Sequence, residues 1–457
     1  MKIIIVGCGK VGSSLVDQLS KEKHEITIVD RNADVVSDIS NTYDVMGVVG
    51  NGASYELLQE TGIEEANLLI AVTDSDEVNM LACLVAKKVG GSNNPDFATI
   101  ARVRNPLYSK EVAYIKEELG LATTINPEYA AAMEISRLIR FPSASKVDTF
   151  AKGKVELVKM EIPENSPLNG LSLIDIGKKY SMPVLIGIVE RGEEVVIPRG
   201  NFVLMPGDRI SLIATPEIAR HFFHKVGLAV KGAKNVMIIG GGTIAIYLAE
   251  ELLKSGITVK IVDWNREKCE ELSDRMPEAA IICGDASNQD VLFEEGIRTV
   301  DGFVSLTGID ETNIFLSLFA KRVSKAKVIT KVNRISFDDI IEEFNPGSII
   351  YPKSITADYI VRYVRAKSNS IGSNVETLYR LMDGRVETLE FSIRKNSPVA
   401  GIPLMELKLK KDVLIACINH RGRIEIPNGR SVIHEGDTVV IITTTSGFSD
   451  IQDVLEG

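Results

Sequence analysis

Three glycines near the start of the chain, Gly7, Gly9 and Gly12, follow an apolar run at residues 3–6. Apolar residues at helical spacing come next, and Asp30 ends the following β-branched run. On a strand-to-helix turn, such glycines permit the tight turn, the approach of a pyrophosphate and close helix packing, while the acidic residue accepts hydrogen bonds from ribose hydroxyls. The pattern therefore predicts a dinucleotide site with a helix N-terminus facing the phosphates.

The residues around this turn also indicate which dinucleotide fits. The carboxylate of Asp30 would repel a 2′-phosphate, which favours NAD(H) over NADP(H), although the neighbouring Arg31 weakens that preference. Cys8 lies inside the glycine turn and is interpreted as a small residue that fills it rather than as a redox sensor. The alternative for the whole motif is a glycine turn that serves packing alone.

The opening pattern returns in the second half of the chain. Two glycines and the acidic residue recur at the same spacing, and an alanine replaces the third glycine, which the pattern tolerates. The second-half residues are Gly240, Gly242, Ala245 and Asp263. Residues 50–54 also return at 284–287, and residues 73–79 return at 307–313. A period this long indicates duplicated domains rather than a solenoid.

A second kind of module is duplicated as well. Residues near 154–214 and near 385–443 share an apolar run, an Ile-Pro pair and a Gly-Asp turn in the same order. The chain is therefore predicted to alternate large and small domains. The predicted bounds are 1–142 and 229–370 for the large domains, and 143–228 and 371–457 for the small ones.

Alternating strands and helices in the large domains predict an α/β fold with two doubly wound, Rossmann-like parallel sheets. In the first domain the predicted strands are 2–6, 25–29, 44–49, 68–72, 97–101 and 123–125, and the predicted helices are 10–20, 33–40, 54–61, 76–89, 107–118 and 128–140. The last helix has a counterpart at 355–365. The small domains are predicted as α+β, with short strands and one short helix each, and with a hairpin that turns at 191–193 in the first.

Composition and charge argue against several classes of protein. The chain of 457 residues has a net charge of −10 and a pI near 5.3, which argues against a nucleic-acid partner. No run approaches the roughly 18 apolar residues of a membrane span. The five cysteines form no C-x-x-C pair, so we expect no disulfide framework, no metal site and a reducing, cytoplasmic environment.

The duplicated order resembles a known family. The glycine motif with Asp30, the segments G-N-G-A-S and T-D-S-D-E-V-N, and the module P-L-N-G…I-P-R-G…M-P-G-D are similar to the N- and C-domain pair of regulators of potassium conductance (RCK or KTN domains). Two such pairs in one chain without a membrane span resemble the peripheral NAD-binding subunits of bacterial Trk potassium uptake systems. The resemblance covers essentially the whole chain.

The resemblance implies function and site residues. Members of this family are not enzymes; they assemble as a ring, here expected to be a homotetramer, under a membrane potassium-translocating subunit (TrkH/TrkG-like) and bind nucleotides that open or close its pore. The implied ligand is NAD(H), with ATP and ADP as further candidates, and the implied location is the inner face of the cell membrane. The implied nucleotide-binding residues are Gly7, Cys8, Gly9, Lys10, Val11, Asp30, Asn51, Gly52, Thr73, Asp74 and Arg102 in the first half, and Gly240, Gly241, Gly242, Thr243, Ile244, Asp263, Asp285, Thr307 and Lys331 in the second.

Some points stay open at the level of sequence. The second half departs from the family pattern at Ala245 and at Gly308, which replaces Asp74, and both changes bear on the affinity or ligand choice of the second site. The resemblance also implies that the helices at 128–140 and 355–365 cross to a partner domain; the alternative is an ordinary interdomain helix. The alternative functions are an NAD-dependent oxidoreductase, for which no histidine stands near a glycine motif, and a regulator of another cation transporter.

Overall fold

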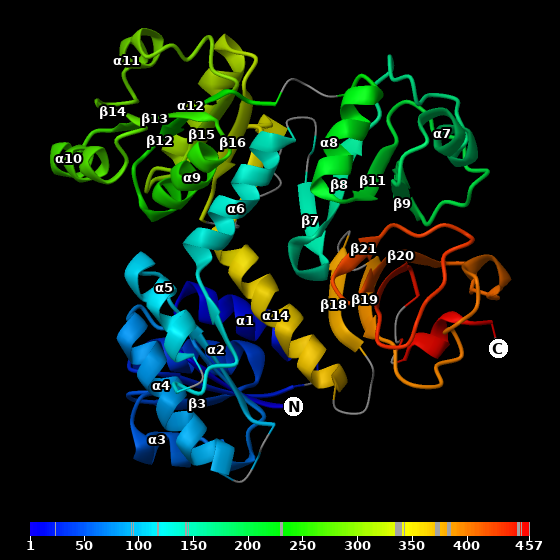
Figure 1. The fold of residues 1–457 in the computed structure, drawn as a ribbon. Helices are drawn as coiled ribbons and strands as arrows, with labels where there is room; N and C mark the ends of the chain where they lie inside the picture. The colour runs from blue at the N-terminus through cyan, green and yellow to red at the C-terminus, as the bar shows by residue number, and fades with distance from the viewer. Residues whose placement is uncertain are drawn as a thin grey trace. The chain divides into compact units, whose positions relative to one another are not determined.

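The computed structural model describes residues 1–456 except 23, 93, 95, 117, 142–143, 145, 229–231, 334–340, 342, 371–374, 382–384, 446–447 and 449. The chain forms two compact units (Figure 1). The first unit contains Met1–Ile135 and Asn235–Val361, and the second contains Ser136–Lys234 and Arg362–Gly457. Within the described residues, no helix is both long enough and apolar enough to cross a membrane.

The first parallel sheet of unit one has the strand order β3-β2-β1-β4-β5-β6. Its strands are β1 (Lys2–Val6), β2 (Glu25–Asp30), β3 (Met46–Val49), β4 (Leu68–Ala71), β5 (Ala98–Arg102) and β6 (Thr123–Ile125). The strand order reverses between β1 and β4, which is the switch point where doubly wound sheets bind ligands. β4 is buried along its whole length, as expected for a strand covered by helices on both faces.

The helices of this domain follow the predicted alternation. They are α1 (Lys10–Ser20), α2 (Ala33–Tyr43), α3 (Tyr55–Glu60), α4 (Asp76–Val89), α5 (Pro106–Ile115) and α6 (Pro127–Arg140), with short 3-10 turns at Ile63–Glu65 and Gly90–Ser92. Asn32 accepts from backbone N–H groups of α2, and Ser75 accepts from the N–H of Val78 in α4. Asn126 caps α6 in the same way by accepting from the N–H of Tyr129 at 2.8 Å. The predicted α/β architecture is confirmed.

The second parallel sheet repeats the first, with the order β14-β13-β12-β15-β16-β17. Its strands are β12 (Asn235–Ile239), β13 (Thr258–Asp263), β14 (Ala280–Cys283), β15 (Gly302–Ser305), β16 (Lys327–Lys331) and β17 (Ser348–Ile350). Its helices are α9 (Thr243–Lys254), α10 (Arg266–Arg275), α11 (Gln289–Glu294), α12 (Asp310–Val323) and α14 (Pro352–Ser370). Helix α14 is longer than the predicted segment 355–365.

The last helix of each large domain contacts the other large domain within unit one. Tyr129 of α6 packs edge-on against Tyr247 of α9, with ring centroids 5.4 Å apart. The side-chain amide of Asn126, just before α6, donates to the Tyr247 hydroxyl at 2.9 Å. The last helix of the second large domain, α14, contacts the first large domain in turn, because Gln18 of α1 donates to Asp358 of α14 at 3.2 Å. These two helices therefore join the halves of the chain.

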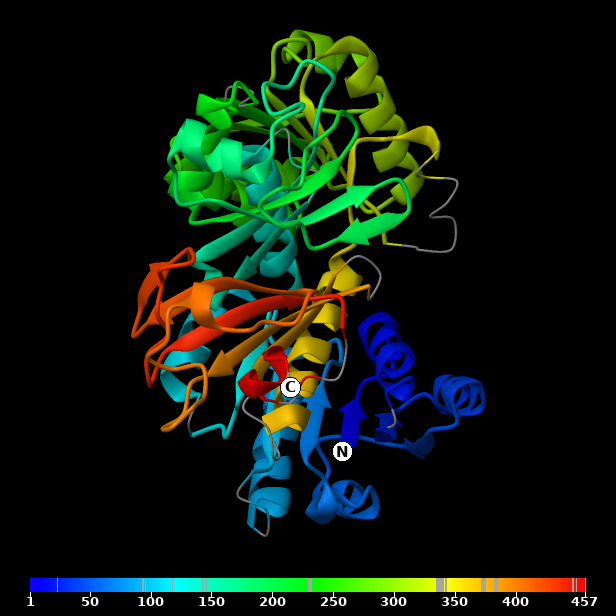
Figure 2. The same ribbon diagram turned by 90° about the vertical axis from the view of Figure 1, so that its right-hand side faces the viewer.

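Unit two holds two antiparallel sheets with equivalent strand orders, β10-β9-β11-β8-β7 and β18-β19-β22-β20-β21. The first sheet contains β7 (Lys146–Phe150), β8 (Val155–Glu161), β9 (Leu185–Arg191), β10 (Glu194–Val196) and β11 (Arg209–Ala214), and the second contains β18 (Val375–Leu381), β19 (Val386–Ser392), β20 (Val413–His420), β21 (Arg423–Glu425) and β22 (Thr438–Thr443). The predicted hairpin is confirmed, because Arg191 pairs with Glu194. Figure 2 shows the second sheet in orange and red.

The helices of unit two differ from the prediction of one per small domain. The first small domain has two, α7 (Leu173–Tyr180) and α8 (Pro216–Lys225), after a 3-10 turn at Ala151–Gly153. In the described part of the second small domain, 3-10 turns at Leu404–Glu406 and Ile451–Val454 take the corresponding places in the chain order. Pro403 precedes the first of these turns. One apolar core contains residues of both sheets, including Ile188, Ile213, Ala416 and Ile442.

Candidate nucleotide sites

The first glycine turn has the conformation that its residues predict. Gly7 has φ +97°, and a Cβ added there would lie 2.7 Å from the backbone nitrogen of Thr73. A Cβ on Gly12 would lie 2.0 Å from the carbonyl oxygen of Gly7, so only glycine lets α1 approach β1 this closely. Gly9 has no atom within 4 Å of such a position and therefore leaves open space beside the turn. Lys10 is exposed and Val11 is buried.

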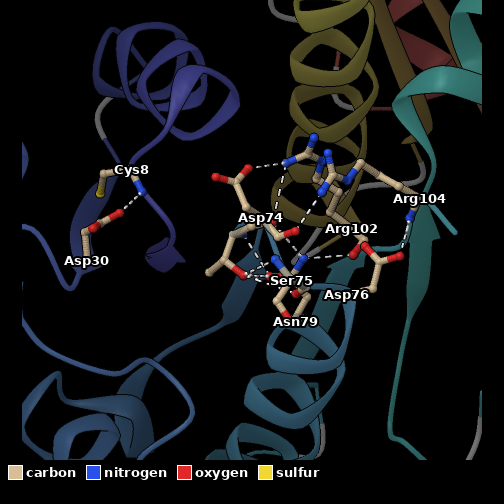
Figure 3. A network of polar contacts seen from close by, with 9 residues as sticks. Cys8, Asp30, Asp74, Ser75, Asp76, Asn79, Arg102 and Arg104 are labelled. Carbon is tan, nitrogen blue, oxygen red and sulfur yellow. Dashed lines mark hydrogen bonds and ion pairs between the residues drawn. The ribbon is translucent and has the colours of Figure 1, made fainter. Parts of the chain in front are cut away.

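Asp30 holds this turn in place (Figure 3). Its Oδ2 accepts a hydrogen bond from the backbone N–H of Cys8 at 2.7 Å, and its Oδ1 accepts from the N–H of Asn32 at 2.9 Å. Two carboxylate oxygens offer about four acceptor positions, so room remains for ribose hydroxyls. The sequence predicted Asp30 as a ligand residue, and the structure adds a role in positioning the phosphate turn.

The second glycine turn repeats this geometry. The backbone N–H of Gly241 donates to Oδ2 of Asp263 at 2.7 Å, and the N–H of Asn265 donates to Oδ1 at 2.9 Å. Gly240 has φ +95°, and Gly242 again leaves open space. One charge is new, because Lys268 Nζ lies 3.5 Å from Oδ2 of Asp263. The second half therefore keeps the turn despite its alanine at position 245.

A buried asparagine connects the ends of two strands beside each turn, and the sequence did not single it out as a site residue. Asn79 Oδ1 accepts from the backbone N–H and the hydroxyl of Thr73 at 2.8 and 2.7 Å (Figure 3). Its Nδ2 donates to the carbonyl oxygens of Thr73 and Arg102 at 3.1 and 2.9 Å. Asn313 makes the same four bonds with Thr307 and Lys331. The sequence could have indicated this asparagine as a site residue, because it recurs at the same position in both halves.

A partly compensated cation is the last residue of the fifth strand of each sheet. In the first half, Arg102 Nη1 lies 3.6 Å from Oδ1 of Asp74, whose side chain is fully exposed (Figure 3). Burial lowers the pKa of Arg102, and the nearby Arg104 lowers it further, while Glu128, Asp74 and Asp76 oppose the shift. Among the described residues, Nε of Arg102 has no hydrogen-bond partner. Such a buried cation favours the arrival of an anion.

Lys331 occupies the equivalent position in the second half. Its Nζ donates to the carbonyl oxygen of Leu306 at 3.2 Å. Burial lowers the pKa of Lys331; Asp310 and Glu128 oppose this shift, and Lys268 adds to it. Because Gly308 replaces Asp74, this lysine lacks the exposed carboxylate that stands beside Arg102. The electrostatic environment of the second turn therefore differs from that of the first.

Both cations line one cavity of about 280 Å³ within unit one. The second glycine turn lines it through Gly242–Ala245, whereas the first contributes only Val11. The remaining lining residues are Pro127, Glu128, Leu306, Asn333, Pro352 and Lys353. Oε2 of Glu128 has no hydrogen-bond partner among the described residues. The chain order places Lys353 where the first half has Glu128, so one acidic and one basic residue face this cavity from equivalent helices.

Three predicted residues follow the third strand of a sheet, two of them after β3 and one after β14, and do not line this cavity. Asn51 is exposed and accepts from the N–H of Ala53 at 3.3 Å, and Asp285 accepts from the N–H of Ser287 at 2.8 Å. The hydrogen bonds from Ser287 lower the pKa of Asp285. Gly52 is buried, and a Cβ there would lie 2.2 Å from Val6, which gives this glycine a packing role.

None of the five histidines belongs to either glycine turn. The five histidines lie before β2 (His24), on α8 (His221 and His224), at the end of β20 (His420) and before β22 (His434). In the part of the chain that the structure describes, no group of three or more metal-ligating side chains is suited to hold a metal ion.

Comparisons with known proteins agree with this architecture. The TrkA-N domain model matches residues 3–127 and 236–352, and the TrkA-C domain model matches 157–227 and 388–456. The Trk system potassium uptake protein TrkA of Vibrio alginolyticus is 31% identical over 462 aligned positions, which cover 100% of this chain and 99% of the relative. TrkA homolog 1 of Methanosarcina mazei is 30% identical, with 99% of each chain covered.

Solved structures share the fold at low sequence identity. The GsuK channel has a TM-score of 0.65 and 18% identity, and the match covers 97% of this chain and 77% of the channel chain. The isolated GsuK RCK domain has a TM-score of 0.63, with 92% of its chain covered. The fold and the duplicated turns define a protein built from two pairs of TrkA-N and TrkA-C domains. The chain belongs to the TrkA family of Trk system potassium uptake proteins.

Proposed function

We propose that the chain is the nucleotide-binding, regulatory subunit of a potassium uptake system. The observation that carries this proposal is the repeated site geometry: at each switch point, a carboxylate holds a glycine turn and a partly buried cation stands beside it. The names of its full-length relatives indicate potassium uptake as the transport process. The protein would not itself catalyse a reaction.

We propose NAD(H) as the ligand, with ATP and ADP as further candidates. Asp30 and Asp263 would accept the ribose hydroxyls, and the N-termini of α1 and α9 would face the phosphates. Two solved structures of this fold are described as GsuK bound to NAD and GsuK bound to ADP, which supports the choice of ligands to test. The proposed site consists of the residues predicted from the sequence, together with Asn79, Asn313 and Glu128.

Regulation would follow from differential affinity. A nucleotide shifts a ring between two shapes only as far as its affinities for those shapes differ. The cavity that contains Arg102 and Lys331 is lined by both large domains, so an anion bound there would favour one arrangement of the two. We propose that a homotetrameric ring transmits this change to a membrane potassium-translocating subunit from the cytoplasmic face of the membrane.

The first experiment is a calorimetric titration of the purified chain with NADH, NAD, ATP and ADP. We expect Asp30→Ala and Asp263→Ala each to remove one class of site, because each removes the ribose acceptor and loosens one glycine turn. Asp38→Ala, on the exposed side of α2, is the matched control and should bind as the wild type does. A wild-type chain that binds none of the four nucleotides would overturn the proposal.

The second experiment tests the partner. Potassium flux through a co-purified membrane subunit in proteoliposomes is measured with the chain present and each nucleotide added in turn. We expect the flux to depend on the nucleotide, and we expect Asp30→Ala to reduce that dependence. Equal fluxes with every nucleotide and without any would contradict a regulatory role, whatever the titration shows.

Two alternatives have distinct signatures. An NAD-dependent oxidoreductase needs an acid or base beside the nicotinamide, and none of the five histidines lies at a glycine turn. Consumption of NADH with a panel of small carbonyl compounds would support that function. A regulator of another cation transporter would bind nucleotides in the same way but would co-purify with a different membrane protein.

A further inference from the structure

The second large domain carries two cysteines where the first carries two valines. Cys269 lies on α10 and Cys283 ends β14. The equivalent helix and strand of the first half, α2 and β3, have Val36 and Val49 at these positions. The duplication therefore shows that an apolar pair satisfies the fold here, and that the thiols are a feature of the second half alone.

The backbone brings the two cysteines together beside the carboxylate of the second turn. Cys283 is the Cα partner of Asp263 in the parallel pairing of β13 and β14. The Cys269 thiol donates to the carbonyl oxygen of Asp263 at 3.3 Å and lies 3.9 Å from the carbonyl oxygen of Ile282. Side chains alternate along a strand, so Cys283 and Ile281 lie on one face of β14 and Ile282 on the other.

The two thiols interact and differ in access to solvent. Burial raises the pKa of Cys269 to about 11, and Cys283 is the next contributor to that shift. Cys269 is buried, whereas Cys283 is exposed. The other three cysteines, Cys8, Cys83 and Cys417, are buried. An oxidant in solution would therefore reach Cys283 first, with Cys269 as its neighbour.

We propose that Cys269 and Cys283 form a reversible disulfide that weakens nucleotide binding at the second site. The effect on binding rests on the proposed nucleotide function, whereas formation of the bond does not. The bond would connect α10 to the end of β14 across Asp263, whose carbonyl oxygen also accepts the backbone N–H of Gly284 at 2.9 Å. Closing it removes the hydrogen bond from Cys269 to that carbonyl and displaces the end of β13, which carries the ribose acceptor.

A peroxide is a sufficient oxidant. The Cys283 thiolate attacks the O–O bond of hydrogen peroxide and becomes a sulfenic acid, with loss of one water after proton uptake. The Cys269 thiolate then attacks the Cys283 sulfur, the S–S bond forms, and a second water leaves. Two thiols thus supply two electrons to one peroxide, and a small thiol reductant reverses the bond by exchange. Because the raised pKa of Cys269 makes its thiolate scarce at neutral pH, closure should accelerate as the pH rises.

The test combines mass spectrometry with the titration described above. After treatment with hydrogen peroxide, digestion without reductant should yield a linked peptide pair that contains Cys269 and Cys283. The affinity of the second site should fall about tenfold, as for the loss of one charge-assisted hydrogen bond between a ribose hydroxyl and Asp263. The affinity should recover after reduction. First-site affinity should not change. The Cys269→Val and Cys283→Val double variant reproduces the first-half pair and should bind equally well before and after peroxide.

The outcomes separate this proposal from the function on which it rests. If no linked peptide forms at neutral or alkaline pH while Cys283 is oxidised to the sulfinic acid, the disulfide is excluded. If the link forms and second-site affinity is unchanged, the control of binding is excluded. If the reduced chain binds no nucleotide at the second site, the proposed second nucleotide site and its redox control are both excluded, and the linked peptide still reports whether the bond exists.

Discussion

At the scale of single residues, the two halves have the same hydrogen bonds between side chains and backbone but differ in the charges around them. Asp30 and Asp263 each hold a glycine turn through one backbone N–H group, that of Cys8 or Gly241. Each also accepts from the N–H group of the asparagine two residues further on. The cation at the end of the fifth strand is arginine in the first half and lysine in the second. The framework of each site is thus conserved within the chain, and ligand preference is where the halves should differ.

Replacement of Lys331 should separate stability from binding. Burial lowers the pKa of this lysine, which means that the folded state disfavours its charge. We expect Lys331→Met to raise the thermal unfolding temperature of the nucleotide-free chain, because a buried charge is removed. The same variant should weaken nucleotide binding at the second site by about tenfold, because a charge-assisted bond to phosphate is lost. Calorimetric titration and a thermal melt measure the two effects.

The pH dependence of this variant series has a definite sign. The ammonium of Lys331 loses its proton at a lower pH than an ordinary lysine, so second-site affinity should fall as the pH rises through that lowered pKa. Lys331→Arg, which copies Arg102, should stay charged and retain affinity in the alkaline range. Identical pH profiles for the wild type and Lys331→Arg would show that this lysine does not contact the ligand.

At the scale of elements, sequence periodicity predicted most strands and helices of the first large domain within a few residues. Short apolar runs bounded by glycine predicted the strands because both faces of a doubly wound sheet are buried. The small domains were less predictable, since the segment that is helix α7 in one copy corresponds to a 3-10 turn after Pro403 in the other. The asparagine bonds were missed because they join segments that only the folded sheet brings together.

The packing of α1 on β1 gives a prediction about one glycine. We expect Gly12→Ala to destabilise the first large domain by about 1–3 kcal/mol, since the added methyl group would overlap the Gly7 carbonyl oxygen. First-site nucleotide affinity should fall as the turn shifts. The control is Gly177→Ala in α7, where a Cβ meets no atom within 4 Å and should stabilise the helix by about 0.5–1 kcal/mol. Thermal melts of both variants decide whether the contact matters.

The buried asparagine gives a second prediction at this scale. Asn79→Ala leaves the backbone N–H of Thr73 without its acceptor and removes a bond to the end of β5, which should cost about 1–3 kcal/mol. Asn313→Ala should cost a similar amount, because its four bonds are equivalent. Hydrogen exchange at β4 and β5, or at β15 and β16, should increase locally in each variant. If one variant showed the same increase in hydrogen exchange in both halves of the chain, the asparagine network would not stabilise its own domain locally.

At the scale of the whole molecule, the duplication was readable from the sequence, whereas the cavity shared by the two halves was not. The repeat of glycines, acidic residues and threonines predicted two equivalent sites. The cavity lined by Arg102, Lys331 and Glu128 depends on where α6 and α14 begin relative to both glycine turns. Periodicity within one domain contains no information on such a contact between domains. The predicted domain boundaries and the ring likewise stay predictions.

The exposed faces of two equivalent helices give the prediction about assembly. Phe315 on α12 has 71% of its surface exposed, and Leu81 holds the equivalent place on α4 with 49% exposed. Because single exposed apolar residues are common, our hypothesis that another subunit covers this surface rests on the repetition of the position in both halves. We expect Phe315→Glu to convert the proposed tetramer into smaller species in sedimentation velocity, because burying the new carboxylate would be unfavourable. Met405→Glu changes a side chain of nearly the same exposure, 72%, on the small domain and serves as the control. A Phe315→Glu chain that still sediments as the wild type would exclude α12 from the ring interface, and a wild-type monomer would remove the ring from the proposed mechanism.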